Sequence, residues 1–143
     1  MRALWKATLA CAISLVGTSA ASADELKDLV QLCAADLKNV SSDPLSGSYV
    51  GMWDGKLPHL LTIVQVERPK VVVYYSTTVY VPWGIKRGNC SKIEGTISGD
   101  KISLNLTGTN AVAVYAVTGD VLTGVYTRGG VDTPGTFKKV SLK

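Results

Sequence analysis

Lys101-Ile102-Ser103-Leu104-Asn105-Leu106-Thr107 alternates strictly between apolar and polar side chains. Successive side chains of an extended chain lie on opposite faces, so the isoleucine and the two leucines share one face and the polar residues share the other. The stretch therefore predicts a β-strand with one face in a core and the other in water.

Further β-forming segments flank this strand on both sides, from residue 48 to the end of the chain. Short runs rich in Val, Ile, Thr and Tyr are separated by Gly, Pro, Asn and Asp, which is typical of strands joined by turns. We predict strands at residues 48–53, 60–67, 70–80, 91–97, 101–107, 111–118, 121–128 and 133–142. Eight short antiparallel strands in succession favour an up-and-down barrel, which leaves no open edge, and a two-sheet β-sandwich is the alternative.

The segment before the strands reads as one helix over residues 24–40. Its apolar residues recur at spacings of three and four, which gives one apolar stripe: Leu26, Leu29, Val30, Cys33, Leu37 and Val40. Asp24 and Glu25 stand where a helix N-terminus favours negative charge. Pro44 and the polar residues before it stop the helix, and we expect its apolar stripe to pack on the barrel.

The first 23 residues have the three parts of an export signal. Arg2 and Lys6 precede an uncharged, mostly apolar stretch, and small residues ending in Ala21-Ser22-Ala23 follow. The apolar stretch is shorter than the roughly 20 residues that cross a bilayer, although a retained anchor is the alternative. We predict a signal peptide (1–23) cleaved after Ala23, a helix and linker (24–46), a barrel domain (47–143), and a secreted or periplasmic protein.

Cleavage would change both the charge and the cysteine count. Of 15 Lys+Arg, 13 remain against 11 Asp+Glu, so the net charge falls from +4 to +2. This mild excess, without a basic stripe, argues against nucleic-acid binding; it favours anionic surfaces such as lipid headgroups, with no stable membrane insertion. Cys33 and Cys90 remain as an even pair, which predicts a disulfide in an oxidising compartment.

Few residues are suited to catalysis. His59 is the single histidine, and nothing around it resembles a nucleophile site, so its simplest role is structural, at the start of a strand with one hydrogen bond. One histidine and two distant cysteines argue against a metal site, the glycines form no nucleotide-binding pattern, and we predict no cofactor. Asp54 and Glu94 have no obvious turn role, which leaves them as the pair for a carbohydrate-active hydrolase. The sequence favours a protein without catalytic residues.

Two resemblances concern the first strands. Gly51-Met52-Trp53 resembles the Gly-x-Trp that opens lipocalin and avidin-like (calycin) barrels, which implies that Trp53 closes one barrel end as part of the core. Lipocalins also place an arginine over this tryptophan after the last strand, whereas Arg128, the nearest candidate here, precedes it. The wider pattern Gly-x-Trp-x-Gly-x-Leu-Pro at 51–58, then Val-Val-Tyr at 72–74 and Trp-x-x-Lys-Arg-Gly at 83–88, resembles a family of bacterial exported small β-barrel domains. That resemblance implies a fold and a compartment, and no reaction.

The longest connection between predicted strands, at 80–89, is the candidate binding loop. It combines Trp83 with two adjacent cations, Lys86 and Arg87, beside glycines. Loops on a rigid scaffold often bind ligands. The tryptophan can stack on a sugar or hold a peptide, while the cations can pair with an anion. Alternatively, Trp83 folds back to plug the barrel.

The tyrosines extend this candidate site. Alternation places Tyr74 and Tyr80 on one face of their strand, next to the loop, while Val71, Val73, Tyr75 and Val79 form the predicted core set. We therefore expect an exported, non-enzymatic binding module for a glycan, peptide or anionic envelope component. A glycan, peptide or protein of the cell envelope is the expected partner, and a protein-interaction domain without a small ligand is the main alternative. The predicted ligand-binding residues are Trp83, Lys86, Arg87, Tyr80 and Tyr74.

Overall fold

The computed structural model describes residues 23–33, 40–106 and 110–141. Within these ranges the single α-helix, α1 (Ala23–Cys33), covers the first part of the predicted helix, and residues 34–39 lie outside the description. Residues 1–22, and with them almost all of the predicted signal peptide, also lie outside it. None of the described helices has the length and apolar character needed to cross a bilayer.

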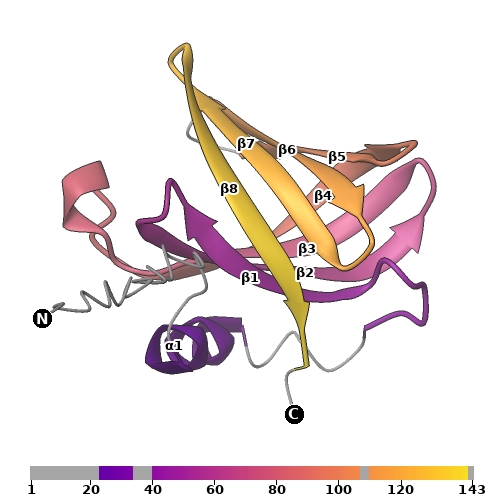
Figure 1. Cartoon of the computed structure of the whole chain (residues 1–143), viewed down its shortest axis with the longest axis horizontal. Helices are drawn as coiled ribbons and strands as arrows, with labels where there is room; N and C mark the ends of the chain where they lie inside the picture. Colours follow the sequence, from indigo (N-terminus) through magenta and orange to yellow (C-terminus); the bar gives the residue numbers. More distant parts are fainter. Residues whose placement is uncertain (1–22, 34–39, 107–109, 142–143) are drawn as a thin grey trace, which may run out of the picture.

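Eight antiparallel strands form a closed barrel (Figure 1). Each strand pairs with the next along the chain, and β1 pairs with β8 to close the sheet. The predicted up-and-down barrel with a packed helix is confirmed, and the β-sandwich alternative is wrong. The strands are β1 (Gly47–Trp53), β2 (Leu57–Glu67), β3 (Lys70–Thr77), β4 (Asn89–Ser98), β5 (Lys101–Leu106), β6 (Ala111–Thr118), β7 (Val121–Arg128) and β8 (Val131–Val140).

Two strand ends differ from the prediction by about three residues. Strand β2 begins at Leu57 instead of residue 60, and β3 ends at Thr77 instead of residue 80. The prediction that Val79 belongs to the core is wrong, because this residue is 51% exposed. Thr77 is the last residue of β3 to pair with a neighbour, with His59 of β2 on one side and with Asn89, the first residue of β4, on the other, so the chain leaves the sheet after it.

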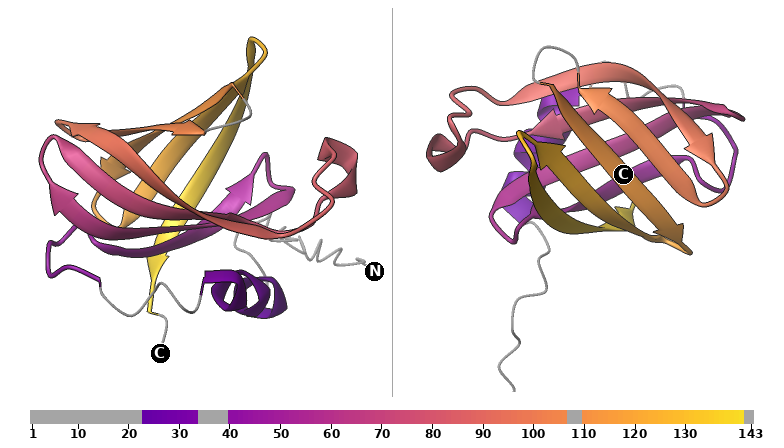
Figure 2. Two further views of the ribbon diagram at one scale, coloured as in Figure 1. Left: turned by 180° about the vertical axis from the view of Figure 1, so that it is seen from behind. Right: turned by 90° about the horizontal axis from the view of Figure 1, so that it is seen from above.

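The barrel interior is filled by large apolar and aromatic side chains, and α1 covers part of the outside. Leu29 of α1 packs with Val50 and Leu60 in a second, smaller cluster on the outer face. The residues of β2 from Leu57 to Val64 are consequently all buried, on both faces of the sheet. Figures 1 and 2 show the helix lying against this side of the barrel.

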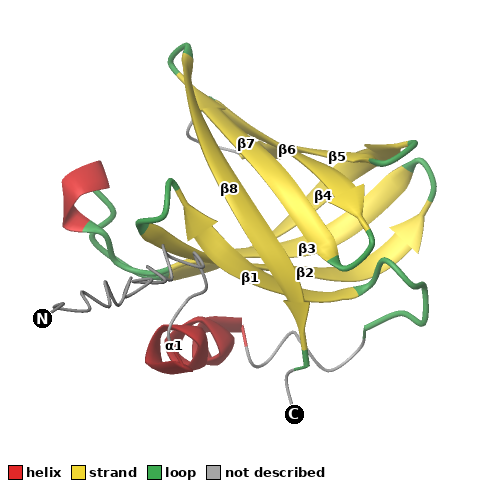
Figure 3. Ribbon diagram, in the orientation of Figure 1, coloured by secondary structure: helices red, strands yellow, loops and turns green. Residues whose placement is uncertain are grey.

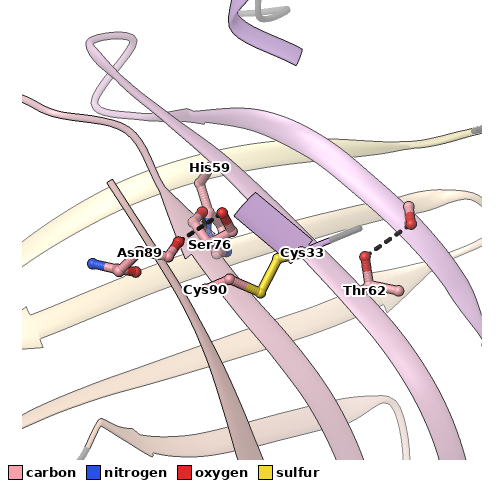
Figure 4. The surroundings of a disulfide bond; sticks show 7 residues. Cys33, His59, Thr62, Ser76, Asn89 and Cys90 are labelled. Atoms are coloured by element: carbon pink, nitrogen blue, oxygen red, sulfur yellow. Dashed lines mark hydrogen bonds between the residues drawn. A yellow bond between two sulfur atoms is a disulfide. The ribbon is translucent and has the colours of Figure 1, made fainter. Parts of the chain in front are cut away.

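The Cys33–Cys90 disulfide joins the end of α1 to the start of β4, with 5.5 Å between the two Cα atoms (Figure 4). The predicted cysteine pairing is confirmed. Next to it, a Cβ added at Gly88 would lie 2.8 Å from Cδ1 of Leu32, so the chain entering β4 also presses directly on the helix. The helix is therefore fixed to the barrel beside the 78–88 connection.

The seam between β1 and β8 requires glycine at one position. A Cβ at Gly51 would lie 1.9 Å from the carbonyl oxygen of Thr136, far inside contact distance. Gly124 of β7 and Gly135 of β8, which pair with each other, leave the space that the rings of Trp53 and Phe137 occupy. The absence of side chains at these positions lets the strands close around bulky rings.

Candidate functional site: a cavity at one end of the barrel

Trp53, the last residue of β1, is almost fully buried at the centre of an aromatic cluster. Its ring centroid lies 4.8 Å from that of Phe137, in an edge-to-face arrangement, and 5.8 Å from those of Tyr115 and Tyr126. The indole Nε1–H donates a hydrogen bond to the hydroxyl of Tyr75 at 3.1 Å. These contacts place Trp53 in the core, where it also borders the cavity described below.

His59 lies in the same cluster and is fully buried. Its Nδ1 lies 2.9 Å from the carbonyl oxygen of Ser76, and its Nε2 lies 2.9 Å from the hydroxyl of Tyr115. A carbonyl oxygen only accepts, so Nδ1 carries the proton and Nε2 accepts from Tyr115. The sequence-based expectation of one hydrogen bond is therefore wrong, because both ring nitrogens are engaged (Figure 4 shows His59 beside Ser76).

The electrostatics of this cluster keep it uncharged. Burial lowers the pKa of His59 to about 3, although the hydrogen bond to Ser76 opposes the shift. Burial also raises the pKa of Tyr75 and of Tyr115 above the ordinary tyrosine value. His59 is not among the described residues that line the cavity, so its imidazole is not placed to act as a general base on a molecule held there.

A cavity of about 450 Å³ opens at the end of the barrel where β1, β3, β5 and β7 finish. Its walls are mostly apolar and aromatic, and its one charged residue among the described lining is Arg128. In Figure 3 this end carries the 78–88 loop with its short helical turn and the β7–β8 turn. The lining residues are Trp53, Leu57, Tyr75, Thr77, Trp83, Ile85, Asn89, Ser91, Ile93, Leu106, Tyr126, Arg128, Val131 and Thr133.

Trp83 reaches the cavity from a loop that makes its own backbone hydrogen bonds. It ends the 3₁₀ turn η1 (Val81–Trp83), whose geometry is completed by Gly84 in the left-handed region at φ 72°. The backbones of Tyr80 and Ile85 exchange two hydrogen bonds of 2.9 and 3.1 Å, and the Tyr80 ring packs edge-on against Trp83 at 5.3 Å. Trp83 is partly buried against the barrel core, as expected of a ring that folds back onto the barrel. It also lines the cavity, as expected of a binding residue.

The other four predicted binding residues do not line the cavity. Lys86 and Arg87 are exposed on the loop. Tyr80 supports Trp83, and Tyr74 lies on the outer face of β3, where its register neighbours are Thr62 and Lys92. The structure therefore brings Trp83, of these five residues, to the cavity.

Sequence reasoning missed Arg128 as a cavity residue, whereas Tyr75, which it placed in the core, borders the cavity from β3. Arg128 ends β7, and the tight β7–β8 turn holds it at the same barrel end as Trp53. A signal was available, because in an up-and-down barrel all odd-numbered strands finish at one end. The resemblance to lipocalins, which place an arginine over the tryptophan, also indicated Arg128, although Arg128 precedes the last strand.

Asp54 and Glu94, the carboxylates considered for hydrolysis, are both exposed. Asp54 lies in the β1–β2 turn with φ 52°, and its carboxylate is 3.6 Å from Nζ of Lys56. The expectation that Asp54 has no turn role is wrong. Glu94 pairs with Lys70 at 3.8 Å, and neither carboxylate is among the described cavity residues.

Within the described ranges, no three His, Cys, Asp or Glu side chains are grouped so as to hold a metal ion. A scan of the sequence against protein-family models gives no match, and a search of curated proteins gives none either.

Proposed function

We propose that the protein is an exported, non-enzymatic binding module that holds a small anionic amphiphile in the cavity at the open end of the barrel. The observation that carries this proposal is the cavity itself, with mostly apolar walls and Arg128 as the one charged residue of its described lining. Its volume of about 450 Å³ lies within the range of roughly 300–1,000 Å³ that is usual for small-molecule sites.

The apolar part of the ligand would contact the side chains that form most of the wall. Leu57, Ile85 and Ile93 supply aliphatic surface, and Trp83 supplies a ring on which a flat or extended group can pack. Burial of such a group stabilises the complex by about 25 cal/mol for each Å² removed from water. This lining favours a ligand with a substantial apolar body over a fully hydroxylated glycan.

The polar part of the ligand would be fixed by two donors. The Arg128 guanidinium can form a charge-assisted hydrogen bond with a carboxylate, sulfonate or phosphate. The Tyr75 hydroxyl accepts from Trp53, and its own proton has no described acceptor, so it is available to the ligand. Of the classes expected from sequence, an anionic envelope component agrees best with these donors.

Export agrees with the Cys33–Cys90 disulfide, because such bonds persist in oxidising compartments. The proposal has no catalytic step, since the neutral His59 and the two exposed carboxylates contribute nothing to the described cavity lining. A domain that only contacts other proteins would not need this cavity.

A pair of matched fluorescent probes tests the proposal. Anilinonaphthalene sulfonate carries an anionic group on an apolar body, and N-phenylnaphthylamine is an uncharged analogue. We expect both to bind with one-to-one stoichiometry. Arg128→Met should weaken binding of the sulfonate probe by roughly 10- to 100-fold, which is the contribution of a charged hydrogen bond. The affinity for the neutral probe should stay unchanged. The control Arg68→Met removes an arginine at the opposite barrel end.

A second variant tests the location of the site. Ser91 lines the cavity from β4, and Ser98 ends the same strand at the far end of the barrel. Ser91→Phe should therefore exclude both probes, and Ser98→Phe should not. If neither probe binds the wild type, or if the variant and control of each pair behave alike, the proposed function is wrong.

A further inference from the structure

The loop 78–88 and the β7–β8 turn project beyond the barrel (Figures 1 and 2), and residues of the loop and beside the turn line the cavity. Their tips carry the three most exposed large apolar residues of the described chain: Val81 (77% exposed), Val131 (66%) and Val79 (51%). Pro82, beside Val81, is exposed as well. Exposed apolar residues are ordinary when scattered, but these gather at one end of the molecule.

Positive charge accompanies these tips. Lys86 and Arg87 are exposed on the loop, and residues 78–88 include no acidic residue. The acids nearest along the rim are already engaged: Asp54 lies beside Lys56, and Asp132 accepts a hydrogen bond from the hydroxyl of Thr127. Among the described rim residues, four cations (Lys56, Lys86, Arg87 and Arg128) outnumber two acids (Asp54 and Asp132), which gives a positive balance.

We infer that this rim docks on an anionic lipid bilayer, with Val79, Val81 and Val131 entering the headgroup region and Lys86 and Arg87 contacting the lipid charges. Apolar tips flanked by cations are the combination by which proteins bind reversibly at a membrane surface. The inference goes beyond ligand binding, because docking needs only the exposed rim and not an occupied cavity.

The shape of the rim favours a bilayer over a protein groove as the partner. Val79 and Val81 belong to the 78–88 loop, and Val131 follows the β7–β8 turn; Figure 2 shows these two segments as separate projections. A fluid headgroup layer accepts two separate tips, whereas a protein partner would need a matching relief. Complementary charge adds to the argument, since anionic lipids attract cations near the surface.

Internal contacts hold the loop in its conformation. The Tyr80–Ile85 backbone bonds and the Tyr80–Trp83 packing fix the apolar turn. At its other end, Gly88 presses on Leu32 of α1, and the adjacent chain is held by the disulfide at Cys90. A preformed loop loses little conformational entropy on binding.

Vesicle sedimentation tests the inference, with the full chain and its disulfide intact. We expect the wild type to bind vesicles of 70% phosphatidylcholine and 30% phosphatidylglycerol, and to bind pure phosphatidylcholine far less. Replacing both loop cations, Lys86→Glu with Arg87→Glu, should weaken binding by roughly thirtyfold or more, at about a fivefold effect per cation. The matched control, Lys101→Glu with Lys138→Glu, makes the same change of charge on exposed strand positions elsewhere and should bind nearly as the wild type does.

The apolar contribution has its own pair of variants. Val81→Asp should weaken binding by roughly tenfold, and Val125→Asp, on the outer face of β7, should have little effect. The inference is overturned if the wild type does not prefer anionic vesicles, or if the loop variants bind as well as their controls. Probe binding without vesicles, measured on the same variants, reports separately on the cavity, so that failure of docking and failure of ligand binding remain distinct.

Discussion

Protonation of His59 should be one of the main causes of acid instability in this protein. The ring is fully buried, with both nitrogens hydrogen-bonded and its pKa lowered to about 3 from 6.5. A proton on Nε2 would turn this atom into a donor facing the Tyr115 hydroxyl, which now donates to it. The native state therefore resists protonation, while the unfolded chain binds a proton below pH 6.5.

The direction and size of the effect follow from this difference. Because the unfolded state binds more protons between pH 6.5 and 3, the free energy of unfolding falls as the pH falls through that window, by about 1.4 kcal/mol per pH unit. At pH 4.5, two units below the unfolded pKa, the loss is about 3 kcal/mol. The tyrosines in contact with the ring do not titrate in this range, since burial raises their pKa.

The variant His59→Gln isolates this contribution. A glutamine amide can donate to Ser76 and accept from Tyr115 but has no proton to gain, and the chain contains one histidine. The wild type should be the more stable protein at pH 7.5, because the ring packs against Trp53 and Phe137. That advantage should shrink by about 3 kcal/mol on going to pH 4.5, while carboxylate titration affects both proteins alike.

Urea unfolding at pH 7.5, 6.5, 5.5 and 4.5, followed by circular dichroism, measures this difference. Equal slopes against urea in the two proteins would show that the comparison is sound. A stability difference between wild type and His59→Gln that stays constant across these pH values would refute the reasoning. Titration of the His59 ring protons near pH 6.5 in the folded protein, observed by NMR, would refute it as well.

Two further predictions concern the scaffold. Replacing Cys33 and Cys90, 57 residues apart, by serine should lower the free energy of unfolding by about 4 kcal/mol, measured by urea unfolding; a loss equal to that of a surface substitution would contradict it. Gly135→Ala should lower it by about 1–3 kcal/mol, because the new Cβ would lie 2.8 Å from Cε3 of Trp53. Thr136→Ala, at the exposed neighbouring position, serves as the control and should change the midpoint of urea unfolding little. Similar unfolding midpoints for the two variants would contradict the prediction.

The strands with one wet face were the easiest to predict. Strands β6 (Ala111–Thr118) and β7 (Val121–Arg128) have the predicted bounds, because alternation and glycine turns mark them clearly. Strand β2 was predicted to begin too late, since α1 and the core bury both of its faces and remove the alternation. Val79 shows the opposite error: the alternation continues past Thr77, but the partner strand does not.

The candidate site was predictable only in part. Trp83 is recognisable as a large aromatic residue in a long loop, and it does line the cavity. Arg128 and Tyr126 come from β7, far along the chain, and reach the same place because the sheet closes. The spacing of residues within one strand shows which face of the sheet each side chain lies on. Which side chains of different strands meet inside the barrel depends on the register of all eight pairings.

The closing of the sheet also has a kinetic consequence. Seven of the eight strand pairings join consecutive strands, and the eighth, β1 with β8, joins residues as distant as Ser48 and Val140. The hairpins can form locally, so the loop-closure entropy of the whole sheet falls on that last pairing. We expect an open, curled sheet to precede the barrel during folding, with two unpaired edges that can aggregate. At Gly51 a Cβ would overlap the Thr136 carbonyl of the opposite edge, so a side chain at this position would hinder that last pairing.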